Sequence, residues 1–218
     1  MIISKARKYV FVHIPKTGGT ALTLALEGRA AKDDIIIGDT PKARQRRKRL
    51  ADLTPAGRLW KHSTLADIDG VVSSAELDDM FCFTLVRNPW DRAVSLYHWL
   101  QAQTFDHPAV ARAQSLSFSG FINHEATKAA FLTQPYHHYV TDAAGQVQCS
   151  LFARLEALET DLQPLWGHLG FVCAVDRVNA SHRARDWRGY YSDADADVIA
   201  SVCQNDITAF GYAFDPQG

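Results

Sequence analysis

A lysine and two glycines stand together near the start of the chain, in the segment IPKTGGTAL from Ile14 to Leu22. Glycines let a backbone wrap closely around a ligand, threonine hydroxyls donate hydrogen bonds, and lysine adds a mobile cation. The segment joins a short apolar run to a helical pattern, and backbone N–H groups at a helix N-terminus bind anions. This order of residue types favours a phosphate-binding loop over the alternative, a plain Gly-Gly turn with surface Lys and Thr.

The loop differs from the phosphate loop of nucleoside triphosphatases. In that pattern, G-x-x-x-x-G-K-[ST], the lysine follows the glycines, whereas Lys16 precedes Gly18 and Gly19. Nothing upstream of Lys16 resembles the first glycine of that pattern. The sequence therefore predicts an anion-binding loop of another kind.

A second candidate anion site lies in the segment LVRNPWDRAVSLYHW. Arg87 directly follows the buried run Met80–Val86, and Ser95 lies eight residues further on, inside a helical pattern. Each hydrogen bond from such a cation to an anion contributes about 1.5–3 kcal/mol. Helical spacing places Ser95 beside Arg92 and Trp99, next to an apolar face that we expect to pack on a sheet and that consists of Ala93, Leu96, Tyr97 and Leu100.

The elements that must position these residues alternate along the chain. Apolar runs predict strands at Lys8–Ile14, Asp33–Ile37, Met80–Val86 and Leu151–Leu158. Periodic patterns and capping residues predict helices at Thr20–Gly28, Lys42–Leu53, Ser73–Met80, Asp91–Gln103, Leu158–Phe171 and Ser192–Tyr212. The segment Thr104–Gln148 is weakly periodic, with helical hints around Phe118 and a turn at DAAG. This alternation predicts a three-layer α/β/α fold around a central parallel sheet. Two strand-end anion sites in such a sheet suit a ligand with two separated phosphates.

Composition and charge limit the possible functions. The chain has 218 residues, of which 47% are hydrophobic and 22% charged, which is typical of one globular domain. Lys and Arg total 23 against 24 for Asp and Glu, so no overall field favours nucleic acid, and an anion must be bound locally. No repeat or linker is visible, and we expect one domain over residues 1–218.

Cysteine usage and hydropathy indicate a cytoplasmic protein. The cysteines match no metal or redox pattern and are expected to be reduced and buried: Cys82, Cys149, Cys173 and Cys203. The first residues show no signal-peptide pattern, and no run approaches the roughly 18 consecutive apolar residues of a membrane span. We therefore expect a chain without a membrane span.

The two motifs together resemble a known family. FVHIPKTGGT and FTLVRNPWDRAVSLYHW are similar to the two donor-binding motifs of the sulfotransferase superfamily, whose donor is 3′-phosphoadenosine-5′-phosphosulfate (PAPS). The segments RLEALETDLQPLWGHLGF and NASHRARDWRGYYSDADADVIASVCQNDITAFGYAF also resemble that superfamily, so the likeness covers most of the chain. The carbohydrate branch, which includes the 2-O-sulfotransferases and compact bacterial members, is the most similar.

The resemblance implies a P-loop-like nucleotide-binding fold and a role for each motif. The first motif would bind the 5′-phosphosulfate through Lys16, Thr17, Gly18, Gly19 and Thr20. The second would bind the 3′-phosphate through Arg87 and Ser95, and Arg183 of a basic loop would approach the donor. Lys16 would also neutralise charge on the leaving oxygen. No metal is required, because backbone donors and cations meet the charge of the donor.

The acceptor hydroxyl needs a general base, and histidine suits that role near neutral pH. The resemblance points to His62, which lies between the motifs beside Lys61; the alternative is a capping or surface histidine ahead of a helix. His137 and His138 are a second choice of base or acceptor contact. His13 is expected to be structural, with the alternative that it leans toward the site. The adenine could stack on Trp60, Trp90 or Trp187.

These features predict transfer of a sulfuryl group from PAPS to a hydroxyl of a sugar or glycolipid acceptor. An ATP-dependent small-molecule kinase and a non-catalytic nucleotide-binding homologue are the alternatives. The basic run Lys42–Arg49, with six cations in eight residues, is either a solvated helix face or a contact for an anionic acceptor or a membrane surface.

Overall fold

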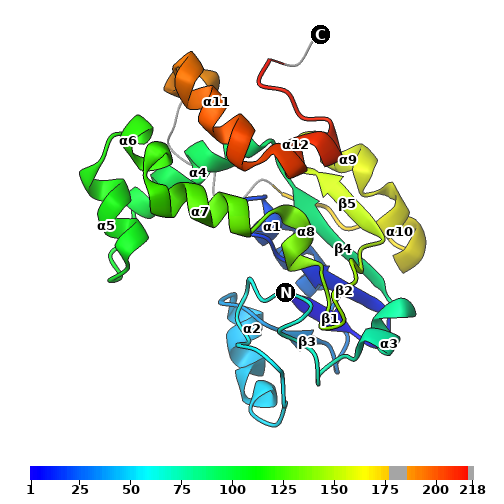
Figure 1. Cartoon of the computed structure of the whole chain (residues 1–218). Coiled ribbons are helices and arrows are strands. Elements are labelled where there is room, and N and C mark those ends of the chain that lie inside the picture. The colour runs from blue at the N-terminus through cyan, green and yellow to red at the C-terminus, as the bar shows by residue number, and fades with distance from the viewer. Residues whose placement is uncertain (177–185, 216–218) are drawn as a thin grey trace. The chain divides into compact units, whose positions relative to one another are not determined.

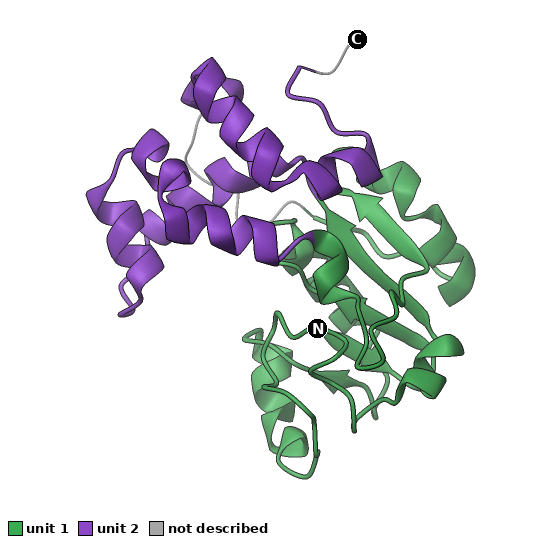
Figure 2. Ribbon diagram, viewed as in Figure 1, with its two compact units in different colours: residues 1–86, 136–178 green, residues 87–135, 179–218 purple. Residues whose placement is uncertain are grey.

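A computed structural model describes residues 1–176 and 186–215 of the chain. The chain divides into two compact units, each built from two segments (Figure 2). Unit 1 comprises Met1–Val86 and Tyr136–Val178, and unit 2 comprises Arg87–Pro135 and Asn179–Gly218. The predicted donor contact Arg183 lies outside the described residues.

Unit 1 contains the strands, which form one five-stranded sheet in the order β3-β1-β2-β4-β5 (Figure 1). Strands β2, β4 and β5 run parallel, with Tyr9 opposite Phe81 and Phe83 opposite Leu151. β1 pairs antiparallel with both β2 and β3 and so extends the sheet on one side. The predicted α/β fold with a parallel central sheet is confirmed. The strands are β1 Ile2–Ser4, β2 Tyr9–Val12, β3 Ile35–Ile36, β4 Phe81–Val86 and β5 Leu151–Arg154.

The N-terminal strand prediction needs a correction. The sequence predicted one strand over Lys8–Ile14, but the apolar residues Met1–Ile3 belong to a hairpin that turns at Lys5–Lys8. Lys8 adopts a left-handed φ of 51°, and Arg7 donates its backbone N–H to Ser4 Oγ at 3.3 Å. The cationic turn reverses the chain, so the apolar residues before and after it form two buried strands that pair with each other.

Alternating residues on one face of the sheet form the core of unit 1. The rings of Phe11 and Phe83 stack with centroids 5.1 Å apart and are fully buried. Leu22 of helix α1 and Leu165 of helix α10 pack into the same cluster. This packing fixes α1 against β2, so the loop between them ends at a rigid helix start. The helices of unit 1 are α1 Gly19–Gly28, α2 Pro41–Arg46, α3 Ser74–Asp78, α8 Tyr136–Tyr139, α9 Leu158–Asp161 and α10 Gln163–Leu169, with 3-10 turns at Arg47–Leu50 and Leu155–Ala157.

Unit 2 is helical in its described residues. Helix α4 contributes Ala93, Tyr97 and Leu100 to a core shared with Phe121 and Ile199. These residues therefore pack on other helices, where the sequence predicted packing on a sheet. The helices of unit 2 are α4 Pro89–Gln101, α5 Pro108–Ser115, α6 Phe118–Asn123, α7 Glu125–Thr133, α11 Asp193–Val202 and α12 Gln204–Phe210, with a 3-10 turn at Arg188–Tyr190.

Three predicted helices differ from the structure in length or number, and one of them is the helix predicted over Leu158–Phe171, which is divided at Leu162 into α9 and α10. The basic helix ends at Arg46 and continues as a 3-10 turn to Leu50, short of the predicted Leu53. The C-terminal helix begins after Ser192 as predicted but is interrupted at Cys203, which separates α11 from α12. The weakly patterned middle contains four short helices, and its predicted turn is confirmed at Gly145, with φ 79°. Short helices with side-chain caps give too few turns for a clear period.

Candidate functional site

The loop between β2 and α1 adopts a conformation that glycine makes possible. Gly18 has φ 88° and ψ 3°, and Lys16 adopts a left-handed φ of 67°, which is uncommon for a residue with a side chain. Thr17 is fully buried, and its hydroxyl donates to the carbonyl of Ile14 at 3.0 Å. The Thr17 side chain thus closes the loop, and its hydroxyl hydrogen is directed at the protein.

Helix α1 begins without a side-chain cap. Gly18 is its N-cap residue and makes no side-chain hydrogen bond, and no acidic residue lies in the first turn. Gly19 and Thr20 are the first two helical residues, so their N–H groups point out of the helix start. An uncapped ten-residue helix preceded by Lys16 presents backbone donors, a helix dipole and a cation to an anion.

Both glycines of the loop lie against other side chains. A Cβ on Gly18 would be 2.6 Å from Leu155 Cδ1, and a Cβ on Gly19 would be 2.3 Å from His13 Cδ2. Real Cβ atoms do not approach so closely, so the loop packs at a distance that only glycine allows. The predicted glycine pair is therefore needed for packing as well as for backbone freedom.

His13 follows β2 and lies between the loop and His62. It is buried, and its ring centroid is 4.8 Å from that of His62 in an edge-to-face arrangement. Burial lowers the pKa of His13 well below its usual value, and the positive charge of Lys16 acts in the same direction. His13 is thus neutral at pH 7, and Lys16, His13 and His62 belong to one cluster in unit 1.

His62 is held through one ring nitrogen. Its Nδ1 lies 2.7 Å from the carbonyl oxygen of His13. A carbonyl oxygen only accepts, so Nδ1 bears the proton and Nε2 of the neutral ring has an available lone pair. Burial lowers the pKa of His62 to about 4, and the bond to His13 offsets part of that shift. The ring is therefore neutral at physiological pH.

The chain around His62 is a set of turns, and the next helix, α3, begins only at Ser74. The buried Ser63 hydroxyl accepts from the N–H of Trp60 at 2.9 Å and lies 2.9 Å from the carbonyl of Arg58. Lys61 pairs with Asp39 at 2.8 Å, which holds the pKa of that carboxyl below its usual value. These bonds fix the backbone on both sides of His62.

In unit 2, Arg87 is oriented by Asp91. The Nε and Nη2 atoms of Arg87 donate to Asp91 Oδ2 at 2.9 and 2.6 Å, and both side chains are largely buried. Asn88 caps α4 as predicted, accepting from the N–H of Trp90 at 3.1 Å. Because Arg87, Asp91 and Ser95 are spaced four residues apart, they lie along one side of the helix start.

Ser95 is buried in α4, with 7% of its surface exposed. Within the part of the chain that the structure describes, its hydroxyl has no hydrogen-bond partner, so it remains available to a ligand. Arg92 is equally buried, with its guanidinium 5.7 Å from the centre of the Phe131 ring. The buried face of α4 is therefore broader than the apolar spacing predicted.

The second-choice residues have ordinary surroundings. His137 and His138 are exposed on α8. Trp90 is buried and donates to the carbonyl of Ala196 at 2.9 Å, which makes it a core residue of unit 2. Trp60 is 45% exposed and packs edge-on to His62 with centroids 5.0 Å apart, so it belongs to the unit 1 cluster.

Two partners of the predicted residues were not assigned their contacts from sequence. The ring of His13, expected to be structural with a position near the site as the alternative, lies against Gly19 and His62. Asp91 was assigned only a helix-start role, although its four-residue spacing from Arg87 is the signal for an ion pair. Among the described residues, no cluster of His, Cys, Asp or Glu could hold a metal ion.

The fold and this site define an α/β protein with a glycine loop between its first parallel strand and the uncapped start of the next helix. A family model described as "Sulfotransferase family" matches residues 1–212, so the chain belongs to the sulfotransferase family. The predicted enzyme class is confirmed. A search of curated proteins found no match.

Among solved structures, the chain is similar to mouse sulfotransferase SULT7A1 complexed with PAP. The identity is 15%, the match covers 92% of this chain and 84% of that chain, and the TM-score is 0.47. In addition, no helix within the described ranges is long and apolar enough to cross a membrane.

Proposed function

We propose that this sulfotransferase moves a sulfuryl group from PAPS to a hydroxyl of a carbohydrate or glycolipid acceptor, as a compact member of the 2-O-sulfotransferase-like branch. The family supports the reaction type. The resemblance of the two motifs and of the Lys61-His62 pair supports the donor and the branch. All of residues 1–218 would act as one functional domain.

The glycine loop would bind the 5′-phosphosulfate. The N–H groups of Gly18, Gly19 and Thr20 and the ammonium of Lys16 are the donors for its oxygens. Because the Thr17 hydroxyl is bonded to Ile14, Thr17 would contribute through its backbone N–H. Lys16 would also stabilise the negative charge that develops on the leaving oxygen, which favours the transition state over the ground state.

Arg87 and Ser95 would bind the 3′-phosphate. The Asp91 carboxylate keeps the guanidinium in a fixed orientation, which lowers the entropy that phosphate binding must remove. The Ser95 hydroxyl, unpartnered within the described residues, supplies a neutral donor beside that cation. Arg183 would add a further cation.

His62 would be the general base. Its Nδ1–H is bonded to the His13 carbonyl, so Nε2 is the atom that accepts the proton of the acceptor hydroxyl as oxygen attacks sulfur. This bond, in the unit that also holds the uncapped start of α1, is the observation on which the proposal mainly rests. The bond gives the ring the tautomer that a base requires, and burial keeps the ring unprotonated at physiological pH.

Calorimetry with 3′-phosphoadenosine-5′-phosphate against plain AMP tests the donor assignment. We expect the bisphosphate to bind at least 100-fold more tightly, because several charge-assisted bonds of about 1.5–3 kcal/mol each depend on the 3′-phosphate. Equal weak binding of both nucleotides would refute the role of Arg87 and Ser95. Turnover of ATP with magnesium, and none of PAPS, would instead identify a kinase.

The compartment is a separate proposal. We propose that the protein works in the cytoplasm, and its four free cysteines, Cys82, Cys149, Cys173 and Cys203, are consistent with a reducing environment.

A further inference from the structure

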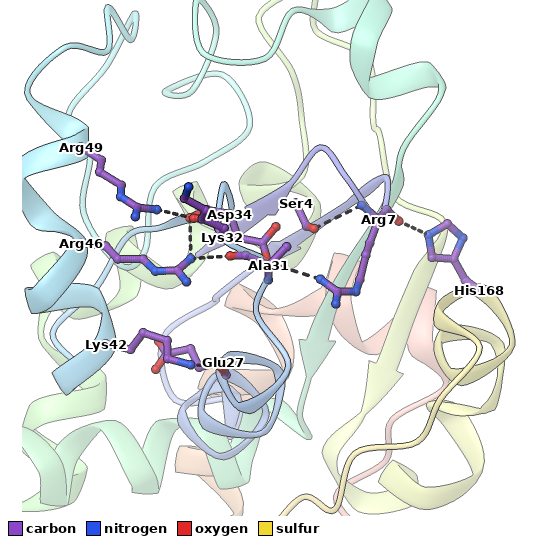
Figure 3. A network of polar contacts seen from close by, with 10 residues as sticks. All are labelled: Ser4, Arg7, Glu27, Ala31, Lys32, Asp34, Lys42, Arg46, Arg49 and His168. Atoms are coloured by element: carbon purple, nitrogen blue, oxygen red, sulfur yellow. Dashed lines mark hydrogen bonds and ion pairs between the residues drawn. The ribbon is translucent and has the colours of Figure 1, made fainter.

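The basic run Lys42–Arg49 has two faces with different roles. Lys42, Arg46 and Arg49, spaced four and three residues apart, turn toward the protein (Figure 3). Arg46 Nη1 donates to the carbonyls of Ala31 and Asp34 at 2.8 and 3.0 Å. Lys42 donates to the Glu27 carbonyl and Arg49 to the Lys32 carbonyl. These three cations satisfy carbonyls at the end of α1 and in the following loop, so their role is structural.

The other three cations face outward. Arg44, Arg47 and Lys48 are exposed, and among the described residues none of them forms an ion pair or hydrogen bond through its side chain. They line a shallow hollow of about 690 Å³ whose remaining walls are apolar: Leu50, Ala51, Leu53, Pro55 and Leu59. The structure therefore places three uncompensated positive charges beside a strip of aliphatic surface.

The lining chemistry distinguishes between possible ligands. The eight lining residues include no carboxylate, hydroxyl or amide side chain. A neutral sugar chain needs acceptors as well as donors for its hydroxyls, and a polyanionic glycan needs cations alone, whereas an anionic lipid needs cations for its headgroup and apolar surface for its glycerol and upper acyl chain. Asp52, the sole acidic residue between Pro41 and Leu59, is not part of the lining. The composition fits an amphiphile better than a polyanion.

We propose that this hollow docks the protein on the anionic surface of a lipid bilayer. Arg44, Arg47 and Lys48 would contact lipid phosphates, and the leucines would enter the interfacial region. Leu59 lies three residues before His62, on the same stretch of turns. Docking would therefore anchor the segment that holds the candidate base near membrane-borne molecules. Membrane binding itself does not depend on the proposed sulfuryl transfer.

Vesicle sedimentation tests the proposal with the full chain. We expect the protein to sediment with vesicles of phosphatidylcholine and phosphatidylglycerol but not with phosphatidylcholine alone. Because each basic residue near an anionic surface contributes about 5-fold in affinity, replacing the three outward cations should weaken binding on the order of 100-fold. The variant is Arg44→Gln, Arg47→Gln and Lys48→Gln together.

The control removes three exposed or partly exposed cations that lie outside the hollow, as Lys8→Gln, Lys32→Gln and Lys128→Gln. It has the same net charge as the test variant and should keep most of the binding. Equal losses in the two variants would show a nonspecific charge effect and overturn the proposal. Full displacement from the vesicles by dextran sulfate at equal charge would show a polyanion site and would overturn it as well.

A Leu53→Ser variant tests the apolar half of the hollow. We expect it to weaken vesicle binding about 5-fold or more while its binding of soluble glycerol phosphate stays at the wild-type level. Unchanged vesicle binding by this variant would contradict insertion of the apolar strip. Thermal unfolding of each variant should match the wild type, because the inward cations Lys42, Arg46 and Arg49 are untouched.

Discussion

The Nδ1 atom of His62 lies 2.7 Å from the carbonyl oxygen of His13. The same residue His13 presents its ring to Gly19, where a Cβ would be 2.3 Å from His13 Cδ2. One residue at the end of β2 therefore contacts both the candidate base and the start of α1. This arrangement means that changes at Gly19 and at His62 should affect each other through His13.

Replacement of His62 by Asn should abolish most transfer activity and leave donor binding intact. Asn keeps an N–H donor near the position of Nδ1, so the bond to the His13 carbonyl can persist while the basic Nε2 is lost. Loss of a general base lowers kcat by about 10²–10⁴-fold. The control His137→Asn changes an exposed histidine and should be silent. A His62→Asn enzyme with wild-type kcat would exclude His62 as the base.

The acid limb of the pH profile should lie unusually low for a histidine. Because burial lowers the pKa of His62 to about 4, the base stays unprotonated down to that pH in the free enzyme. We expect kcat/KM for the donor to stay level from about pH 7.5 to about pH 5.5, where an ordinary histidine of pKa about 6.5 would already be protonated. An acid limb near pH 6.5 that disappears in the Asn variant would contradict the burial of this ring.

The free energy of unfolding should fall as the pH is lowered from about 6.5 to about 4. The neutral ring is favoured in the folded state, so protonation of the unfolded chain below pH 6.5 lowers the free energy of unfolding until the folded ring also titrates near pH 4. The His62 contribution to this loss is about 2–3 kcal/mol at most. Urea unfolding at several pH values checks it: His62→Asn should lose less stability than the wild type as the pH falls.

A methyl group on Gly19 should damage both the fold and the site. Ala at this position must displace the buried His13 ring, and overpacking of this kind costs about 1–3 kcal/mol. We expect a lower melting temperature together with weaker binding of 3′-phosphoadenosine-5′-phosphate. Gly28→Ala, at the other end of α1, meets nothing within 4 Å and should be tolerated. Equal behaviour of the two variants would show that His13 moves aside freely.

The strand–loop–helix units could be predicted because their signals are local. The apolar run before Pro15, the Asn88-Pro89 cap and the glycine at position 170 all specify nearby backbone, and the structure has each of them. The N-terminal hairpin was missed because its turn, Lys5–Lys8, contains no glycine or proline. Its reversal depends on a left-handed lysine, which sequence patterns do not reveal.

The candidate residues were predicted by type, whereas their orientation depends on contacts far apart in sequence. The bond between His62 and His13 spans 49 residues, and the packing of Gly18 joins it to Leu155. No periodicity encodes such pairs. The two faces of the basic run Lys42–Arg49 could be predicted only in part. The sequence shows that Lys42, Arg46 and Arg49 share one helix face, but it does not show that this face contacts the protein while the other faces outward.

Removal of the Asp91 carboxylate tests whether Arg87 must be held in place. Asp91 accepts from two nitrogens of Arg87 and cancels part of its charge. If orientation matters more than net charge, Asp91→Ala should weaken binding of 3′-phosphoadenosine-5′-phosphate about 5–10-fold, equivalent to about 1–1.4 kcal/mol, and leave AMP binding unchanged.

Two substitutions of Arg87 complete the comparison. Arg87→Ala should lose more affinity for the bisphosphate than Asp91→Ala does, so that the two nucleotides bind alike. Arg87→Lys keeps the charge without the planar fork, and its affinity for the bisphosphate should lie between those of the wild type and Arg87→Ala. Tighter binding of the bisphosphate by Asp91→Ala would show that Asp91 competes with the phosphate for Arg87. Calorimetry on the four proteins at one ionic strength separates these outcomes, because charge effects alone would move both nucleotides together.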